Sequence, residues 1–135
     1  MARKINWRKR CDNEWGRVIR EVGYCEMCGS KEGQLHAHHL IRRGNFAYRH
    51  LVENGACLCA SCHTFASHSA HRDRTFFYQW LKRNRPGQWK WLMEHTVKKE
   101  KMIGKTKSID YAPIKMKKEK TDEQEYYELS EIKLG

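Results

Sequence analysis

The 135-residue sequence lacks the features that mark several large classes of protein. No apolar run approaches the roughly 18 residues needed to cross a bilayer, so we expect no membrane segment. The basic residues at the start have no apolar stretch after them, so we expect no secretory signal. This predicts a cytoplasmic location. No internal repeat is visible, and the length allows one modest domain and a tail but excludes a barrel or a doubly wound nucleotide-binding fold.

Acidic residues are also in deficit. The chain has 27 Lys and Arg against 16 Asp and Glu, which gives a formal net charge of +11 at pH 7. Most of this excess falls before residue 97, in the part of the chain that is expected to fold. A basic folded domain favours a polyanionic partner such as nucleic acid.

Apolar spacing predicts a mixture of helices and short strands. In chain order we expect a helix over 7–22 ending at Gly23, a strand over 35–42, a second strand around 56–58, a helix that could begin near His63, a helix capped by Thr75, and a last compact helix that starts at Trp89.

The composition changes after residue 96, so we divide the chain into a folded domain, 1–96, and a tail, 97–135. Residues 97–122 are rich in Lys, Glu, Thr and Ser, which predicts a solvated linker. Residues 123–134 could form a short docking helix through the apolar side chains of Tyr126, Tyr127, Leu129 and Ile132.

Four of the six cysteines form two Cys-x-x-Cys pairs, Cys25/Cys28 and Cys59/Cys62, separated by 30 residues. Cysteines in a protein without a secretory signal are expected to stay reduced and to bind metal. The two-residue gap directs both thiolates of a pair to one side of a turn, so two pairs complete a tetrahedron for a structural zinc ion. The usual gap between such pairs is roughly 15–20 residues, so the longer gap indicates a structured insert.

Two other interpretations of these cysteines have less support. Redox dithiols need a thioredoxin-like βαβ context, which the sequence does not show. Buried cysteines without a ligand have no reason to repeat the same spacing. The remaining two, Cys11 and Cys57, are expected to pack as small apolar side chains.

The segment between the two cysteine pairs is rich in histidine: it carries His36, His38, His39 and His50, and also Asn54. One more histidine, His63, directly follows the last cysteine. Neighbouring strand residues point to opposite faces, so His38 and His39 cannot do the same task. Neutral imidazole binds metal ions, and a free imidazole can take a proton from water. We therefore assign function to His38, His39 and His63, and we interpret His36, His50 and His95 as ordinary surface histidines.

Taken in order, the cysteine pairs, His38-His39, Asn54 and His63 resemble the HNH endonucleases of the zinc-stapled ββα-metal type, and most of all the phage-type members that have a basic helix before the first cysteine pair. The resemblance covers about residues 7–95. It implies an α+β fold with a small ββα-metal nuclease core and a four-cysteine zinc site, flanked by N- and C-terminal helices.

The resemblance also implies a role for each motif position. His39 matches the general base. His38 matches a ligand of the catalytic divalent metal ion, and His63 matches the second ligand. Asn54 matches the central asparagine, which braces the loop and orients the base through backbone hydrogen bonds.

Phosphodiester hydrolysis needs a deprotonated water and a cation on the phosphate. A metal with two protein ligands keeps positions open for phosphate and water, which suits Mg²⁺ or Mn²⁺, although imidazole ligands also accept Ni²⁺ or Zn²⁺. DNA is the expected partner, and its phosphates would be drawn in by Arg42, Arg43, Arg49, Arg72 and Arg74.

The sequence departs from the family pattern at one position. Some relatives carry a further metal-ligating histidine one turn after His63, where this chain has Ser67. His68 and His71 lie close but off register, and each could bind metal, contact phosphate or lie in solvent.

Two other functions stay open beside that of a nuclease in a bacterial or phage-infected cell. One is a zinc-stabilised DNA-binding module without catalysis. The other is an assembly factor of a phage packaging or recombination machine that uses the tail as its contact. We favour the nuclease because a binding module needs neither the His38-His39 pair nor His63. Oligomeric state and DNA specificity are not readable from the sequence.

Overall fold

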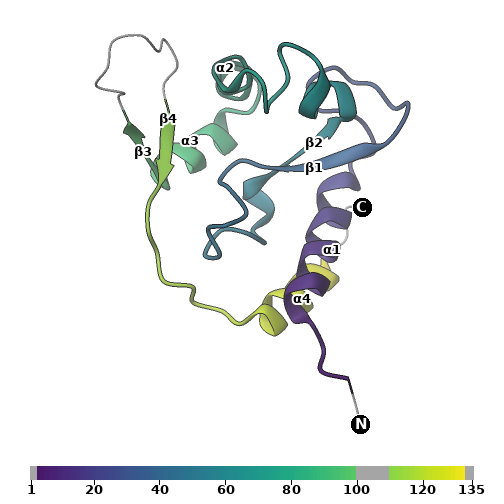
Figure 1. Ribbon diagram of the computed structural model, residues 1–135, viewed down its shortest axis with the longest axis vertical. Helices are drawn as coiled ribbons and strands as arrows, with labels where there is room; N and C mark the ends of the chain where they lie inside the picture. Colours follow the sequence, from purple (N-terminus) through teal and green to yellow (C-terminus); the bar gives the residue numbers. More distant parts are fainter. Residues whose placement is uncertain (1–2, 100–109, 133–135) are drawn as a thin grey trace.

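The computed structural model describes residues 3–99 and 110–132. In chain order these residues form α1 (Trp7–Arg20), β1 (Leu35–His39), a 3₁₀ turn (Val52–Asn54), β2 (Gly55–Cys59), a π-helical turn (Ser61–Phe65), α2 (Arg74–Asn84), α3 (Pro86–Glu94), β3 (Thr96–Lys99), β4 (Asp110–Pro113) and α4 (Asp122–Glu131). Figure 1 shows the β1–β2 hairpin in the middle, with α1 on one side of it and α2 on the other. This arrangement confirms the predicted α+β class.

The central hairpin is antiparallel, with Leu35 opposite Cys59 and His39 opposite Gly55. All five residues of β2 are buried. Successive strand residues face opposite sides, and the two sides of β2 enter different cores. Leu58 joins the core that contains Phe77 and Leu81 of α2, and Cys57 joins the core that contains residues of α1.

The α1 core explains the two cysteines outside the metal-binding pattern. Cys11 and Cys57 are both fully buried, beside Trp15 and Val18. Their predicted role as apolar packing residues is confirmed. The helix itself follows its sequence pattern closely, because Asn6 caps its start by accepting a hydrogen bond from the Lys9 amide and its apolar residues recur every three or four positions.

Helix α4 lies alongside α1 (Figure 1) and closes the same core. Leu129 is buried, and Tyr126 and Ile132 pack around it. Tyr127 is half exposed but its ring lies 5.8 Å from that of Trp7. The helix occupies most of the segment in which we expected a docking helix, and residues 133–134 of that segment lie outside the described residues.

The expected linker over 97–122 is corrected in part. Strands β3 and β4 pair in antiparallel register, with Thr96 opposite Pro113. The physical reason is aromatic packing, since the ring of Tyr111 lies 5.2 Å from that of Tyr78 and 5.8 Å from that of Trp89. Residues 100–109 of the expected linker lie outside the described residues, and the division of the chain after residue 96 stays a prediction.

Three element boundaries also differ from the sequence-based expectations. The cap of α2 is Asp73 and not Thr75, because the Asp73 side chain accepts from the Phe76 amide. Helix α3 begins at Pro86, a residue that suits the first helical position. The helix expected near His63 is a single π turn, since the chain reverses after Phe65.

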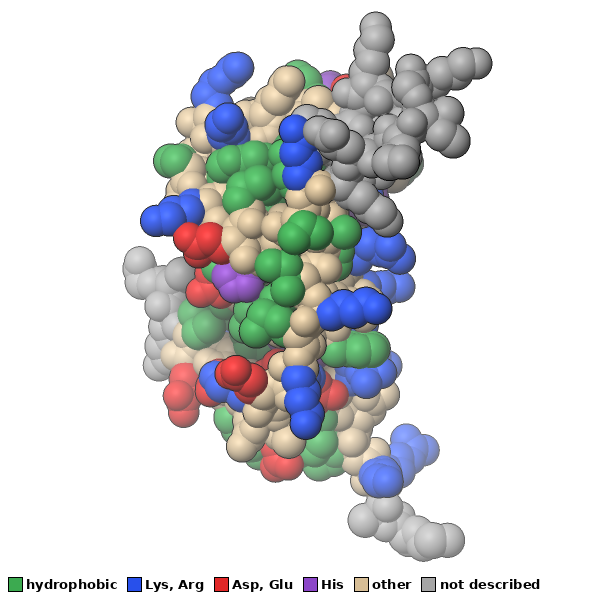
Figure 2. Space-filling model, turned by 90° about the vertical axis from the view of Figure 1, so that its left-hand side faces the viewer, with side chains coloured by type: hydrophobic (Ala, Val, Ile, Leu, Met, Phe, Trp, Pro, Cys, Tyr) green, Lys and Arg blue, Asp and Glu red, His purple; other side chains and the backbone are tan. Residues whose placement is uncertain are grey.

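Among the described residues, no helix has both the length and the apolar character that a bilayer crossing requires. Figure 2 shows the face formed by β3, β4 and the chain that follows them. Apolar side chains run down this face between charged groups of both signs. Val97 of β3, and Ile114 and Met116 in the chain after β4, are exposed. Such mixed character does not fit a surface that binds a polyanion, so this face is a poor candidate for the DNA contact.

Gly55 is required where α1 crosses the start of β2. A methyl group at this position would lie 2.6 Å from Ile19 Cγ1 and 2.9 Å from Trp15 Cζ2. We therefore expect Gly55→Ala to lower the free energy of unfolding by about 1–3 kcal/mol, the usual cost of overpacking. Gly44→Ala is the matched control, because a methyl group there meets nothing within 4 Å.

Denaturant unfolding of both variants checks this prediction. Equal midpoints for Gly55→Ala and Gly44→Ala would show that α1 does not press on the hairpin as the structure indicates.

Candidate active site and metal centres

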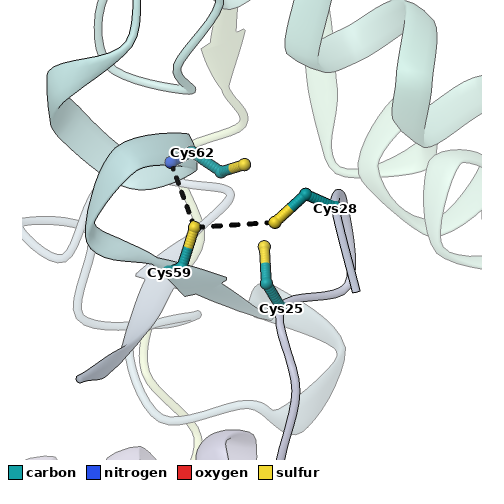
Figure 3. Close-up of side chains that lie close together, drawn as sticks. All are labelled: Cys25, Cys28, Cys59 and Cys62. Carbon is teal, nitrogen blue, oxygen red and sulfur yellow. Dashed lines mark hydrogen bonds between the residues drawn. The ribbon is translucent and has the colours of Figure 1, made fainter. Parts of the chain in front are cut away.

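The four paired cysteines meet at one point, as Figure 3 shows. Cys25 and Cys28 come from the loop after α1, and Cys59 and Cys62 from the end of β2 and the turn that follows. Their four sulfur atoms lie within 4.8 Å of one another, and the Sγ atoms of Cys28 and Cys59 are 3.7 Å apart. A tetrahedral zinc ion with Zn–S bonds of about 2.3 Å needs sulfur atoms about 3.8 Å apart, so the cluster fits a structural zinc site.

Backbone geometry prepares these thiols for metal binding. Gly29 adopts the positive φ of 78° that lets the first turn close, and its amide donates to the Cys25 carbonyl. Burial alone would raise the pKa of the Cys25 thiol, but amide groups of the two turns donate to its sulfur and bring the pKa down to about 7. Burial and the neighbouring sulfur atoms raise the pKa of Cys62, as expected for thiols that ionise together only on a cation.

A second cluster consists of imidazoles on the other face of β1 from α1. One ring nitrogen from each of His38, His63 and His71 lies within 4.8 Å of the other two. The closest pair is His63 Nε2 and His71 Nε2, at 3.0 Å. The structure thus brings together the two expected metal ligands and adds His71, whose role the sequence left open.

The chain reversal after the π turn explains how His71 reaches the cluster. The amide of Ala70 donates to the Cys62 carbonyl, and the amide of His71 donates to the His63 carbonyl. Buried Ser69 ties the reversal together by donating its hydroxyl to the Thr64 carbonyl. The backbone pairing therefore sets His71 beside His63, whereas helical spacing would have selected Ser67.

His36 belongs to the same cluster, which corrects its interpretation as a surface histidine. It shares a strand face with His38, and its Nδ1 lies 2.9 Å from His63 Nδ1. His63 is therefore held at both ring nitrogens, by His36 on one side and His71 on the other. This is the arrangement in which a metal-binding histidine has its ring orientation fixed by an outer partner.

Burial keeps His38 and His63 of this cluster neutral. It lowers the pKa of His63 to about 4, helped by His71 and His36. Burial is the main reason that the pKa of His38 lies well below its ordinary value, and the neighbouring imidazoles lower it further. Neutral imidazole is the form that binds metal, so His38 and His63 have the protonation state of metal ligands at neutral pH.

His39 faces α1, on the opposite side of the strand from His38. Its ring stacks on Trp15, with centroids 3.9 Å apart and planes 12° apart. Its Nε2 lies 2.9 Å from the carbonyl oxygen of Arg49. A carbonyl only accepts hydrogen bonds, so Nε2 carries the proton and Nδ1 keeps its lone pair. Burial lowers the pKa of His39 to about 4, so the ring is neutral.

Asn54 is fully buried behind this strand and bridges the loop that follows it. Its Nδ2 donates to the carbonyls of Ile41 and Tyr48, at 3.0 Å each, and its Oδ1 accepts from the Ile41 amide. These hydrogen bonds brace the loop after β1, and the role of Asn54 in orienting the base stays a prediction. Because the Tyr48 carbonyl lies one residue before Arg49, the same side chain fixes the chain next to the carbonyl that holds His39.

A cleft of about 680 Å³ is lined by residues of the hairpin, the loop after it, α2 and β4. The side chains that give it chemical character are His38, His39, His63, His71, Arg42, Arg43, Arg49 and Arg74. Four of the five expected DNA-contacting arginines are thus on its walls, whereas Arg72 is not among the lining residues. The cleft joins His39, imidazoles of the second cluster and cationic side chains in one space.

Arg49 has a second task within the fold. Its guanidinium makes two hydrogen bonds of 2.8 Å to the Asp12 carboxylate and one to the Arg43 carbonyl. Its side chain is only 13% exposed. The DNA contact expected for Arg49 stays a prediction, and the structure gives this side chain a structural partner.

The other histidines differ in their outcome. His50 is 4% exposed and hydrogen-bonds to two carboxylates, so its interpretation as a surface histidine is wrong. His95 is half-buried and its Nδ1 donates to the Trp91 carbonyl. His68 is exposed, with its ring 5.5 Å from that of Phe76, and is not part of the imidazole cluster.

Comparison with known proteins agrees with the site. Residues 25–69 match the family model of the HNH endonucleases. No curated protein and no solved structure matches the chain significantly. The matched segment runs from the first cysteine of the zinc cluster past His63 and covers one third of the chain. The resemblance to HNH endonucleases inferred from the sequence is confirmed for this segment. The narrower likeness to phage-type members stays a prediction.

Removal of one zinc ligand tests the first metal centre. We expect Cys59→Ser and Cys28→Ser to lose bound zinc and cooperative thermal unfolding together, because metal binding supplies much of the folding free energy in small metal-bound domains. Cys57→Ala is the control, since this buried thiol packs in the core beside α1 and is not part of the four-cysteine cluster. It should keep one zinc ion per chain. Elemental analysis and calorimetry measure both quantities, and a sharp transition in zinc-free Cys59→Ser would rule out a structural metal.

Proposed function

We propose that this protein is a metal-dependent DNA endonuclease that hydrolyses phosphodiester bonds. His39 is the general base, and His38 and His63, joined by His71, hold the catalytic divalent cation. The observation that carries the proposal is one cleft containing an imidazole of fixed tautomer, a cluster of three further imidazoles and exposed arginines. The match of residues 25–69 to the HNH endonuclease model supports a role on nucleic acid with a metal ion.

The hydrogen bond to the Arg49 carbonyl makes His39 suitable as a base. It fixes the proton on Nε2 and leaves Nδ1 with no hydrogen-bond partner within the described part of the chain. The stack on Trp15 holds the ring plane. Nδ1 can therefore accept a proton from a water molecule in line with the leaving 3′ oxygen, and Nε2–H, held by the carbonyl, steadies the positive charge that develops on the ring.

The imidazole cluster fits a divalent cation. Adjacent ligand nitrogens around a metal with bonds of about 2.1 Å lie about 3.0–3.4 Å apart, and the His63–His71 nitrogen distance of 3.0 Å falls in this range. A cation bound there would polarise the scissile phosphate and stabilise the leaving oxygen. His38 is additionally positioned by the edge-on ring of Phe77, at 5.1 Å.

The ligand set bears on which ion is used. Mg²⁺ and Mn²⁺ remain the proposed physiological ions. Three imidazoles, however, are ligands that Ni²⁺ and Zn²⁺ prefer and Mg²⁺ binds poorly. We therefore expect Mn²⁺ and Ni²⁺ to support cleavage at lower concentrations than Mg²⁺.

DNA would enter along the arginines of the cleft. Arg42 and Arg43 follow the strand that carries His38 and His39, and Arg74 lies at the start of α2. Phosphate contacts from these residues would position the backbone without reading sequence. The structure gives no reason to place Arg72 in the same cleft. A packaging or recombination machine as partner remains a proposal that rests on family resemblance.

The first test of this function is the variant His39→Ala. It should cut plasmid cleavage by roughly 10²–10⁴-fold, the usual contribution of general-base catalysis, while zinc content, fold and DNA affinity stay near those of wild type. His68→Ala is the matched control, because this exposed imidazole lies outside both clusters. A plasmid-relaxation time course with added Mn²⁺ measures the effect.

Cleavage by His39→Ala at the wild-type rate would remove His39 from the mechanism. If the wild-type protein binds DNA but does not cleave it with Mg²⁺, Mn²⁺, Ni²⁺ or Zn²⁺, the protein is a DNA-binding module without catalysis.

The second test separates the two metal centres. Mild chelation should abolish cleavage while one zinc ion per chain remains and the domain stays folded, because four thiolates hold zinc far more tightly than three imidazoles hold an exchangeable ion. His63→Ala and His71→Ala should each weaken Mn²⁺ binding, measured by calorimetry, and should need more metal for cleavage. If activity followed the tightly bound zinc, or both variants responded to Mn²⁺ like wild type, a separate imidazole site would be excluded.

A further inference from the structure

A buried ionic group lies behind the proposed base, and neither zinc binding nor the imidazole cluster uses it. Its centre is His50, whose Nδ1 lies 2.6 Å from Glu125 Oε2 of α4 and whose Nε2 lies 2.7 Å from Asp12 Oδ1 of α1. These partners are 75 and 38 residues away in the sequence. The His50 side chain is 1% exposed, so a loop residue is enclosed between two helices from opposite ends of the chain.

The group brings basic and acidic side chains together. Each ring nitrogen of His50 lies within hydrogen-bond distance of a carboxylate oxygen. Arg49 pairs with Asp12 through two hydrogen bonds, and Lys118 lies 3.3 Å from Glu125 and also pairs with Asp122. Three basic side chains therefore face three carboxylates, with His50 and Glu125 at the buried centre. Removal of one member leaves another charge buried without a partner, which is the costly case for such groups.

The trio of Cys11, His50 and Glu125 lies close enough to hold a metal ion, but its ligand atoms are already engaged. Cys11 Sγ donates to the Asp122 carbonyl, and both nitrogens of His50 are bound. The Lys118 ammonium group beside Glu125 would repel a cation. The group is therefore an internal ion-pair network.

This network fixes the chain segment that orients the base. Each residue from Tyr48 to Leu51 is held by a side chain from outside this segment. Asn54 binds the Tyr48 carbonyl, Asp12 binds the Arg49 side chain, Asp12 and Glu125 bind His50, and Trp15 Nε1 donates to the Leu51 carbonyl at 2.8 Å. Within this segment, the Arg49 carbonyl accepts the hydrogen bond from His39 Nε2.

We propose that α4 is a working part of the catalytic unit, and that Glu125 and Asp12 act through His50 as positioning residues for His39. Their hydrogen bonds to His50 and Arg49 fix the position of the Arg49 carbonyl. That carbonyl in turn fixes the tautomer and the ring orientation of His39. The consequence for catalysis rests on the proposed nuclease function. The coupling between α4 and the His39 ring does not.

Two variants test the coupling, each with a control on the same helix. Glu125→Gln and Asp12→Asn keep the side-chain shape and remove one charge. Glu128→Gln on α4 and Glu14→Gln on α1 remove exposed or partly exposed carboxylates that pair with Lys120 and Arg17. Each protein is examined as the full zinc-loaded chain by ¹⁵N nuclear magnetic resonance of the histidine rings and by cleavage kinetics with Mn²⁺.

We expect wild type and both controls to show His39 as a pure Nε2–H tautomer. In Glu125→Gln and Asp12→Asn the two ring nitrogens should give averaged shifts, because the carbonyl no longer fixes the proton. The kcat should fall by about 10-fold or more, while KM, zinc content and Mn²⁺ affinity stay within about twofold. A merely structural role would lower the melting temperature and leave the ring spectrum of the folded protein unchanged.

The proposal is overturned if folded Glu125→Gln and Asp12→Asn give the wild-type His39 spectrum. Should Glu125→Gln not fold at the assay temperature, Glu125→Asp gives the same test, because it keeps the charge and withdraws the oxygen from His50. If wild type shows no cleavage but the two variants change the His39 spectrum, the nuclease function fails and the coupling stands. If His39→Ala abolishes cleavage but Glu125→Gln and Asp12→Asn leave the His39 spectrum unchanged, the nuclease function stands and the coupling fails.

Discussion

The four-cysteine cluster joins the two ends of the segment that carries the proposed catalytic residues. The positions of these residues therefore depend on the cluster. The β1–β2 hairpin has only five residue pairs, and a two-stranded sheet of this size is marginally stable in water. Structural zinc contributes about 10–16 kcal/mol to the folding of small metal-dependent domains. Because Cys59 ends β2 and Cys62 lies in the turn after it, the metal site also fixes the residue after Cys62, which is His63. The zinc site thus also positions His63, the proposed ligand of the catalytic ion.

The alternation of strand β1 separates the two chemical tasks. His36 and His38 face the imidazole cluster, whereas His39 faces Trp15 on α1. Burial lowers the pKa of His38, His39 and His63, so the ligands and the base are neutral under the same conditions. A charged ring on either side would fail, because it could neither bind a cation nor take a proton. The dry environment that the two cores create is therefore part of the proposed chemistry.

The sequence predicted what depends on short-range spacing and missed what depends on distant partners. Two Cys-x-x-Cys pairs, a His-His pair on a strand and an amphipathic helix follow from local periodicity, and the structure contains them. His50 could not be interpreted correctly, because its two carboxylate partners lie on helices far away in the sequence. His71 was left open because it reaches His63 through a chain reversal, which leaves no periodic signal. The paired strands within 97–122 depend on Tyr111 reaching aromatic residues of α2 and α3, and a Lys-rich composition conceals such a contact.

The family match and the proposed catalytic unit differ in extent, and the difference has a physical meaning. Residues 25–69 contain both cysteine pairs, the His38-His39 pair, Asn54 and His63. They do not contain Trp15, which stacks on the base, or Asp12 and Glu125, which clamp the segment that orients it. A motif supplies reactive groups, but the precision of a base depends on the rigidity of what holds it. In this chain we propose that α1 and α4, which both lie outside residues 25–69, supply that rigidity. The two helices would then determine how precisely His39 is oriented.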